Sequence, residues 1–294
     1  MKQVIGVDVG GTALKLGRFT STGECLASVT VPTPQPQHPE LVLTAVAAEI
    51  ASLDPEHQAT AIGIGTPGPT DITARIARIA INLPDWIDVP VADILEAKTN
   101  RSVVVANDAN CAGLGEAWLG AGSQYQNLIL LTLGTGVGGC IILNGKLYVG
   151  HDGSAGELGL VTLNPNGHEC QSGNHGSLEQ HVSAQAIRRE MSMEPGKLAE
   201  LAATGHTKAL NFWQHYGELL AIGLVSSIYV LSPEAVIIGG GISAAAPYFL
   251  DSTQAEIERR IRPRYRNSLK LLTATLGNQA GIVGAAKLAL NHIS

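Results

Sequence analysis

The chain has few charged residues for its length. Only 15% of its 294 residues are Asp, Glu, Lys or Arg, and 25 acidic side chains outnumber 19 Lys and Arg, which gives a net charge of −6. Nucleic-acid binding depends mainly on Lys and Arg that face the phosphates. The composition therefore argues against a nucleic-acid-binding role that rests on a basic face.

Cysteines are also few, and long apolar runs are absent. The four cysteines are scattered without a Cys-x-x-Cys pair. The longest apolar stretch, Leu219–Leu231, has 13 residues that include Gly and Ser, so it predicts a buried helix rather than a membrane span. Lys2-Gln3 leads straight into an apolar strand, unlike a signal peptide. We expect a cytoplasmic protein with reduced thiols and no contact with a membrane.

Apolar residues and glycine are abundant instead. Hydrophobic residues make up 45% of the chain, and its 34 glycines cluster at the ends of apolar runs. Three glycine-rich turns stand out, at residues 8–15, 132–139 and 239–241, and each follows a strand-like run. The length is sufficient for two domains of ordinary size.

Two segments share a pattern of strand, glycine-rich turn and returning strand. The first reads VIGVDVGGTALKLGRF from Val4, and the second reads LILLTLGTGVGGCIIL from Leu128. The similarity indicates an internal duplication, although two short glycine hairpins can also arise separately. Apolar strands alternate with helical segments, so we predict an α/β protein. Further along we expect a strand over Gly159–Leu163 and a helix over Ser177–Arg189.

The stretch SVVVANDANCAGLGEAWL carries the most informative carboxylate. Ser102–Ala106 predicts a buried strand, Asn107 and Asp108 follow at its end, and Ala109–Leu119 predicts a helix. Open α/β sheets bind ligands at the carboxyl ends of their strands. Asp108 is therefore a candidate functional residue, and the alternative is that it only caps the helix.

The first glycine turn contains groups suited to phosphate and metal. Gly10 and Gly11 let backbone N–H groups approach a phosphate, and Thr12 adds a hydroxyl. Asp8, at the end of the strand, is placed to hold Mg²⁺ through water, and Lys15 closes the motif. The alternative is a plain hairpin turn.

The second turn, Leu133–Gly139, has four glycines and one threonine, which suits a backbone cradle around phosphates. It is not a P-loop, because no Gly-Lys-Ser/Thr follows. The third turn, Gly239–Gly241, suits close approach of a flat or anionic ligand. Either turn could instead be only a sharp bend. Asp108 together with three such turns predicts phosphoryl transfer to a hydroxyl.

Several motifs resemble the ROK family of bacterial sugar kinases and sugar-responsive repressors. They are DVGGTALKLG, GIGTPGPTD, INLPDW, VVVANDANCAGLGE, LTLGTGVGG, GSAGELG and EAVIIGGGIS, in the family's order. The resemblance implies a two-domain actin-like (RNase H-like) ATPase fold with an interdomain cleft, in which residues 1–112 plus 277–294 form the smaller domain and residues 113–276 the larger. The first strand begins by Val4, which leaves no room for the helix-turn-helix of the repressors and favours the kinases.

The resemblance also implies an activity. It is the ATP- and Mg²⁺-dependent phosphorylation of a hexose at the 6-hydroxyl, with glucose as the first expectation and Asp108 as the base. Sugar contacts would come from Gly68, Asn82, Asn107, Asp108, Glu157 and Glu179. Contacts to ATP would come from Asp8, Gly10, Gly11, Thr12, Lys15, Gly134, Thr135, Gly136 and Gly240. The alternatives are a kinase for another hexose or an N-acetylhexosamine, a polyphosphate-dependent kinase, and a sugar sensor without turnover.

The chain departs from the family at its zinc site. Where the family has one histidine and three cysteines, this sequence has Leu160, Cys170, Ser172 and Ser177. Serine and leucine cannot replace imidazole and thiolate at zinc, so we expect no structural zinc. A rearranged site of Cys170 with His168 and His175 is the alternative. Leu160 also removes a hydrogen-bonding partner of the sugar.

Two further expectations concern assembly and motion. ROK kinases commonly form homodimers, and Phe212, Trp213 and Tyr216 on a long predicted helix could anchor an interface. Core packing explains these three aromatic residues equally well. A hinge near Ala109–Gly115 would allow the two domains to close.

Overall fold

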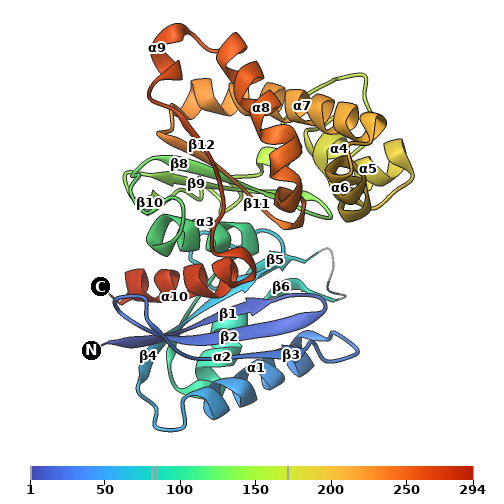
Figure 1. Cartoon of the computed structure of the whole chain (residues 1–294). Helices are drawn as coiled ribbons and strands as arrows, with labels where there is room; N and C mark the ends of the chain where they lie inside the picture. Colours follow the sequence, from blue (N-terminus) through green and yellow to red (C-terminus); the bar gives the residue numbers. More distant parts are fainter. Residues whose placement is uncertain (1, 81–82, 84, 171, 294) are drawn as a thin grey trace. The chain divides into compact units, whose positions relative to one another are not determined.

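The computed structural model describes residues 2–80, 83, 85–170 and 172–293. The chain forms two compact α/β units (Figure 1). The first unit contains Met1–Gln124, Lys146–Gly156 and Thr275–Ser294, and the second contains Tyr125–Gly145 and Glu157–Ala274. The α/β class predicted from the sequence is confirmed. The first unit continues to Gln124, whereas the prediction ended the first part of the small domain at residue 112.

The first unit is built on a sheet with the strand order β3-β2-β1-β4-β7. Strands β1, β4 and β7 are parallel, and β2 and β3 are antiparallel to their neighbours. The strands are β1 (Gln3–Val9), β2 (Ala13–Thr20), β3 (Cys25–Pro32), β4 (Ala59–Thr66) and β7 (Ser102–Asn107). A separate hairpin pairs β5 (Ala77–Ile79) with β6 (Ile87–Val89).

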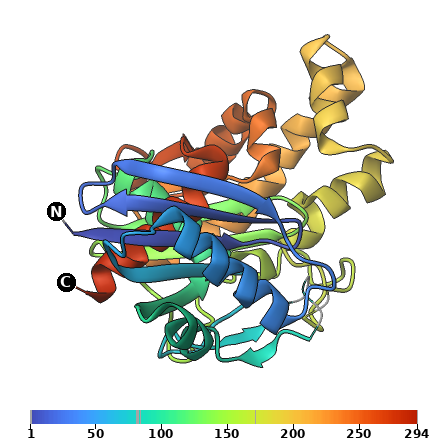
Figure 2. The ribbon, with the colours of Figure 1, turned by 90° about the horizontal axis from the view of Figure 1, so that it is seen from below.

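Helices cover both faces of this sheet. Figures 1 and 2 show α1 (Pro39–Leu53) and α2 (Val91–Thr99) on one face, and α3 (Asp108–Leu119) and α10 (Ala280–His292) on the other. Side chains of β1 pack on both faces of the sheet. Ile5, Val7 and Val9 pack with α1 and α2 on one face, and Val4 packs with α10 on the other. The strand is therefore apolar at nearly every position.

Helix α10 lies unusually close to the sheet. A Cβ atom on Gly6 would lie 2.0 Å from the carbonyl oxygen of Ile282, and one on Gly63 would lie 1.8 Å from that of Ala285. Only glycine fits at these two strand positions, since any side chain would push the helix away. This close packing brings the first turn of α10, which follows the short 3₁₀ helix η3 (Gly277–Gln279), to the end of β1.

The second unit repeats the pattern of hairpin and parallel strands. Its strands follow the order β9-β8-β11-β12, with β8 and β9 antiparallel and with β11 parallel to β8 and β12. The strand–turn–strand pattern that suggested a duplication is thus present in both units. The strands are β8 (Leu128–Leu133), β9 (Val137–Leu143), β11 (Ala235–Gly239) and β12 (Lys270–Thr273), and β10 (Lys146–Leu147) follows β9 in the chain.

The helices of the second unit surround an aromatic core. Trp213 and Tyr216 of α7 lie 5.9 and 5.1 Å, centroid to centroid, from Phe249 of α8, and Phe212 is buried beside them. These aromatic side chains pack the core, so they offer no exposed interface anchor. The helices are α4 (Glu179–Val182), α5 (Ala184–Met191), α6 (Pro195–Ala203), α7 (Thr207–Leu231), α8 (Ala246–Arg260) and α9 (Pro263–Arg266), with 3₁₀ turns η1 (Leu158–Leu160) and η2 (Gly241–Ala245).

Two predicted elements of the second unit were wrong. The strand expected over Gly159–Leu163 is replaced by the 3₁₀ turn η1, which is closed by a hydrogen bond from Leu160 N to Glu157 O. The helix expected over Ser177–Arg189 is interrupted at Ser183, whose hydroxyl accepts from Ala186 N at 3.1 Å and starts a new helix. In the described part of the chain, every helix is too short or too polar to cross a bilayer.

Candidate active site

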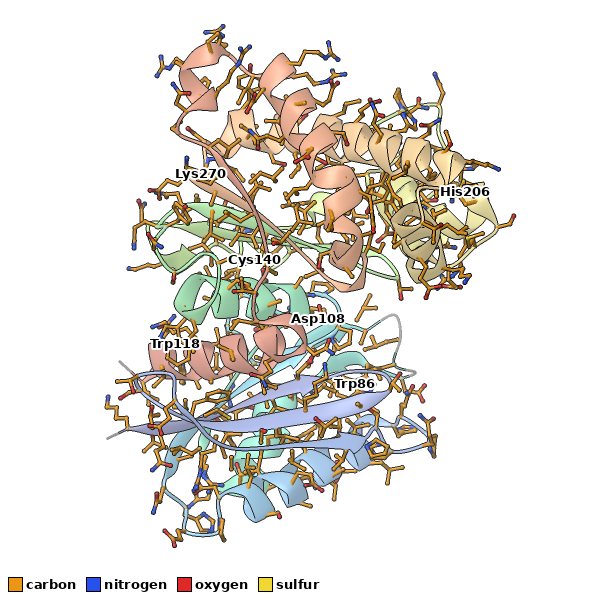
Figure 3. The ribbon with its side chains drawn as sticks, in the orientation of Figure 1. Trp86, Asp108, Trp118, Cys140, His206 and Lys270 are labelled. Atoms are coloured by element: carbon orange, nitrogen blue, oxygen red, sulfur yellow. The ribbon has the colours of Figure 1, made fainter. Side chains whose placement is uncertain are left out.

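Strand β7 delivers Asn107 and Asp108 to the start of α3. Asn107 caps this helix, because its Oδ1 accepts from Ala109 N at 2.9 Å and from Asn110 N at 3.2 Å. The N-cap of α3 is therefore Asn107 rather than Asp108. Asp108 is the first residue of α3, and its Oδ1 accepts from Ala109 N at 2.8 Å. Its side chain is exposed at the helix N-terminus (Figure 3).

Asn107 also joins a second predicted sugar position. Its Nδ2 donates to the carbonyl oxygen of Gly68 at 3.1 Å. Gly68 has a φ of +80°, and a Cβ there would lie 1.8 Å from Ile79 O, so the turn requires glycine. The structure thus brings Gly68 and Asn107 together. Asn82, the third predicted sugar contact of this unit, lies outside the described residues.

The first glycine turn places Asp8 beside a cation and a helix N-terminus. The ammonium group of Lys15 lies 3.3 Å from Asp8 Oδ2. A Cβ on Gly281, in the first turn of α10, would lie 3.0 Å from the Asp8 carboxyl carbon. The partial positive charge of a helix N-terminus favours anions. Lys15 and α10 together therefore make this end of β1 suitable for negative groups.

The turn itself is held by short hydrogen bonds. Gly10 N donates to Ala13 O at 3.0 Å, and the hydroxyl of Thr33 donates to Gly10 O at 2.6 Å. The side chain of Thr12 remains exposed. This geometry leaves a hydroxyl group open to a ligand on a backbone that is fixed at both sides.

The second glycine turn is tied to the α4–α5 segment. Gly134 N donates to Gly136 O at 3.0 Å, and Ala184 N donates to Gly134 O at 2.8 Å. Val137 N donates to Glu179 Oε2 at 2.8 Å. A predicted sugar-binding carboxylate thus contacts a predicted phosphate turn, which the sequence alone did not indicate.

The third glycine turn borders a cavity of about 740 Å³. Gly240 has a φ of +82° and lies against Leu133, the residue before the second turn, since a Cβ would come within 2.4 Å of Leu133 O. Sites for small ligands usually have volumes in this range. The cavity is lined by Gly240, Gly241, Ser243, Ala244, Ala246, Pro247, Leu250, Asp251, Thr273 and Ala274.

Several lining residues of this cavity escaped the sequence analysis. Asp251 lies on α8 and Thr273 on β12, so nothing in the local sequence connects them to Gly240. Ser243 follows the glycine turn closely, and its hydroxyl donates to Gly240 O at 2.7 Å. A hydroxyl four residues after Gly239, the glycine that ends β11, was the one local signal that could have found it.

Glu157 and Glu179 form a carboxylate pair in the second unit. The side chain of Glu157 reaches solvent, but the protein packed around the carboxyl group raises its pKa above the ordinary 4.5, and the negative charge of Glu179 raises it further. Two carboxylates close enough for electrostatic interaction suit a ligand with several hydroxyl donors.

The loop that replaces the zinc site is closed by hydrogen bonds. Cys170 N donates to Asn174 O at 2.7 Å, and the Asn174 side chain donates to Thr162 Oγ1 at 2.8 Å and to Leu160 O at 3.2 Å. The hydroxyl of Ser172 donates to Cys170 Sγ at 3.4 Å. These contacts connect the positions that metal ligands would otherwise join.

The Cys170 thiol is 3% exposed. Burial opposes its ionisation, but hydrogen bonding, which includes the bond from the Ser172 hydroxyl, outweighs burial, so the pKa of Cys170 is lowered. His168 and His175 point their side chains to solvent. Over the residues that the structure describes, no three His, Cys, Asp or Glu side chains come together as a metal site.

Residues 4–292 match the ROK family. The chain belongs to the ROK family. It is 35% identical to a glucokinase from Thermotoga maritima over 311 residues, which cover 99% of this chain and 98% of the relative. The resemblance inferred from the motifs is therefore confirmed, and the ROK match spans both units.

Solved ROK structures share the fold. A glucokinase from Streptomyces griseus, in complex with glucose and AMPPNP, is 32% identical with a TM-score of 0.83, covering 98% of this chain and 99% of that one. A ROK hexokinase from Thermus thermophilus is 32% identical with a TM-score of 0.87, covering 99% of both chains. The protein has the two-domain actin-like ATPase fold that the sequence predicted.

Proposed function

We propose that this protein is a glucokinase, which transfers the γ-phosphoryl group of ATP to the 6-hydroxyl of glucose. The observation that carries the proposal is Asp108, an exposed carboxylate directly after β7, the edge strand of its sheet, at the start of a helix that Asn107 caps. The ROK relatives support it: the Thermotoga maritima relative is a glucokinase, and the Streptomyces griseus structure holds glucose and AMPPNP.

Asp108 accepts the proton of the 6-hydroxyl, and Asn107 orients the sugar. Asn107 is fixed by hydrogen bonds to Gly68 O and to the first turn of α3, so its position is set before sugar binds. Phosphoryl transfer has a loose transition state in which the acceptor proton leaves late. A carboxylate of ordinary basicity is therefore sufficient, and its placement matters more than its pKa.

The glycine turns bind the nucleotide in this proposal. The turns at Gly10–Gly11 and Gly134–Gly136 hold phosphate oxygens through the hydroxyls of Thr12 and Thr135 and through backbone N–H groups other than those of Gly10 and Gly134, which donate within the turns themselves. The cavity beside Gly240 receives the adenosine, and Asp251 and Ser243 offer partners for its hydroxyls. Gly240 borders the cavity and also lies against Leu133, the residue before the phosphate turn.

Asp8 is the residue that would hold Mg²⁺. It offers one partly exposed carboxylate, which suits a hydrated Mg²⁺ that shares its remaining positions with water and phosphate oxygens. Bound there, the cation would neutralise charge on the transferred phosphoryl group. Lys15, beside Asp8, contributes positive charge from the protein itself.

Glu157 and Glu179 accept hydrogen bonds from the sugar hydroxyls in the second unit. Leu160 presents an apolar side chain where the family has a histidine, so one sugar hydroxyl lacks a partner. Such a loss weakens binding by about 1–2 kcal/mol. We therefore expect a modest affinity for glucose with an intact chemical step.

We further propose that the small domain (residues 1–112 and 277–294) and the large domain (residues 113–276) close around the sugar. We also propose that the protein acts as a cytoplasmic homodimer, the assembly expected from the resemblance in its sequence. Light scattering tests the assembly, since a particle of 30.6 kDa at micromolar concentration would be a monomer. Slower hydrogen exchange in residues 65–69 and 150–180 on adding glucose tests closure.

One coupled assay tests the activity. The protein is incubated with ATP and Mg²⁺ and with glucose, mannose, fructose, N-acetylglucosamine or N-acetylmannosamine in turn. We expect the highest kcat/KM for glucose. A preference for an N-acetylhexosamine would change the substrate and keep the chemistry, and no turnover with any sugar would support the sensor instead.

A further inference from the structure

Glu179, which the family resemblance assigns to the sugar, holds the second glycine turn. Its Oε2 accepts from Val137 N at 2.8 Å, and the same oxygen would lie 2.4 Å from a Cβ on Gly136. Five residues later, Ala184 N donates to Gly134 O at 2.8 Å. The short α4–α5 segment therefore contacts the turn at both ends, and at one end the contact is made by a carboxylate.

This contact conflicts with the role proposed for the turn. A phosphate bound by the turn needs backbone N–H groups and disfavours nearby negative charge. The Glu179 carboxylate occupies the N–H of Val137 and places a negative charge against Gly136. As long as this hydrogen bond persists, the turn is a poorer phosphate site than its glycines would allow.

We propose that Glu179 makes nucleotide binding depend on the sugar. A hexose hydroxyl that donates to Glu179 draws the carboxylate away from Val137, which frees the N–H group for a phosphate and moves the negative charge aside. Glu179 is thus a positioning residue for the phosphate turn. The inference rests on the proposed function and adds an order of binding, in which the sugar precedes ATP.

Thermodynamic linkage makes the effect reciprocal. If sugar tightens nucleotide binding by some factor, nucleotide tightens sugar binding by the same factor. Glu157 is a suitable residue for comparison with Glu179. The charge of Glu179 raises the pKa of Glu157, so the two carboxyl groups interact, but the carboxylate hydrogen bond to the turn is made by Glu179. Replacing Glu157 removes a sugar contact alone, whereas replacing Glu179 also removes the hydrogen bond to Val137 N, so the two variants separate these effects.

The test measures the Kd of Mg²⁺–AMPPNP by calorimetry, without sugar and with saturating glucose. In the unchanged protein we expect glucose to tighten AMPPNP binding by about fivefold or more, the usual range for coupled sites. Glu179→Ala should bind AMPPNP without sugar about fivefold more tightly than the unchanged protein. Glu179→Gln should fall between the two, because its amide oxygen still accepts from Val137 N but carries no charge.

Two control variants accompany these. Glu190→Gln removes an equal charge from an exposed position on α5. Glu157→Gln removes a sugar contact and is expected to weaken glucose binding, with a sugar-free AMPPNP affinity equal to that of the Glu190 control. Circular dichroism of each variant confirms folding before the comparison.

The outcomes separate this inference from the proposed function. A sugar-free AMPPNP affinity that is unchanged or weaker in both Glu179 variants would overturn the inference, because a purely structural or purely sugar-binding role predicts those results. Nuclear magnetic resonance of the unchanged protein gives a second readout, since glucose alone should shift the Val137 amide signal. An unshifted signal at saturating glucose would also overturn it. If the unchanged protein does not phosphorylate glucose, the proposed function is wrong. The AMPPNP affinities without sugar test the inference separately, because they do not depend on glucose turnover.

Discussion

The buried carboxylate of Glu116 accepts a hydrogen bond from the backbone N–H of Thr275, 159 residues later in the chain, at 2.9 Å. It also accepts from Leu276 N and from Ala121 N, each at 2.8 Å. The chain first passes from the first unit to the second after Gln124, and it returns for the last time at Thr275. One side chain of the first unit therefore fixes two of the segments that lead to the other unit.

Glu116→Ala should destabilise the protein strongly, because it removes a buried carboxylate that accepts from three partly buried backbone N–H groups. Each unsatisfied donor costs about 1–3 kcal/mol, so we expect the free energy of unfolding to fall by about 3 kcal/mol or more. Urea denaturation measures it. Glu200→Ala, at an exposed position, is the control and should change stability by about 0.5 kcal/mol at most. Equal midpoints for the two variants would mean that Glu116 is replaceable by water.

The sequence predicted the parts of the site that depend on local pattern. A β-branched run followed by Asn107 and Asp108 predicts a strand end and a helix start, and both are present. The role of Glu116 could not be predicted from the sequence, because its carboxylate accepts from a backbone N–H 159 residues later in the chain. The same holds for the cavity beside Gly240, where Asp251 and Thr273 come from separate elements.

Local pattern also failed where one residue redirects the backbone. The helix expected over Ser177–Arg189 is interrupted because the hydroxyl of Ser183 accepts a backbone N–H and starts a new helix. This interruption positions Glu179 and Ala184 against the glycine turn. The contact between Glu179 and Val137 joins two segments that the sequence assigned to different ligands, so only the structure could indicate their coupling.

The pKa of Glu157 predicts how glucose affinity depends on pH. Burial and the charge of Glu179 raise this pKa above 4.5, and only the ionised carboxylate accepts two hydroxyl donors fully. As pH falls from 7, Glu157 becomes protonated earlier than an ordinary Glu, so the KM for glucose should rise already above pH 4.5. Initial rates from pH 8 to pH 5 measure this. A flat KM over that range would show that Glu157 does not bind the sugar.

The ionised form of Glu157, which should favour glucose binding, should lower the stability of the fold. A carboxyl group whose pKa is raised in the folded state destabilises the fold above that raised pKa, and the effect disappears below the ordinary pKa. Glu157→Gln should therefore raise the Tm slightly at pH 7 and leave it unchanged near pH 3.5. A lower Tm at pH 7 would mean that the ionised carboxylate stabilises the fold.

The loop around Cys170 should need no zinc. Its backbone and side-chain hydrogen bonds already join residues 160, 162, 170 and 174. The purified protein should contain no stoichiometric zinc, and treatment with EDTA followed by excess Mg²⁺ should restore full activity. Elemental analysis measures the metal. One tightly held zinc per chain would contradict this account and point to Cys170 with His168 and His175.

The central claim is that Asp108 accepts the proton of the sugar hydroxyl, and Asp108→Asn tests it most directly because the amide keeps the size of the side chain. The measurement is kcat for glucose phosphorylation beside the Kd for glucose, with Asp93→Asn on α2 as the control. We predict a fall in kcat of about 10²-fold or more with little change in Kd, as expected for loss of a general base. A variant that keeps most of its kcat would contradict the account and leave Asp108 a structural residue.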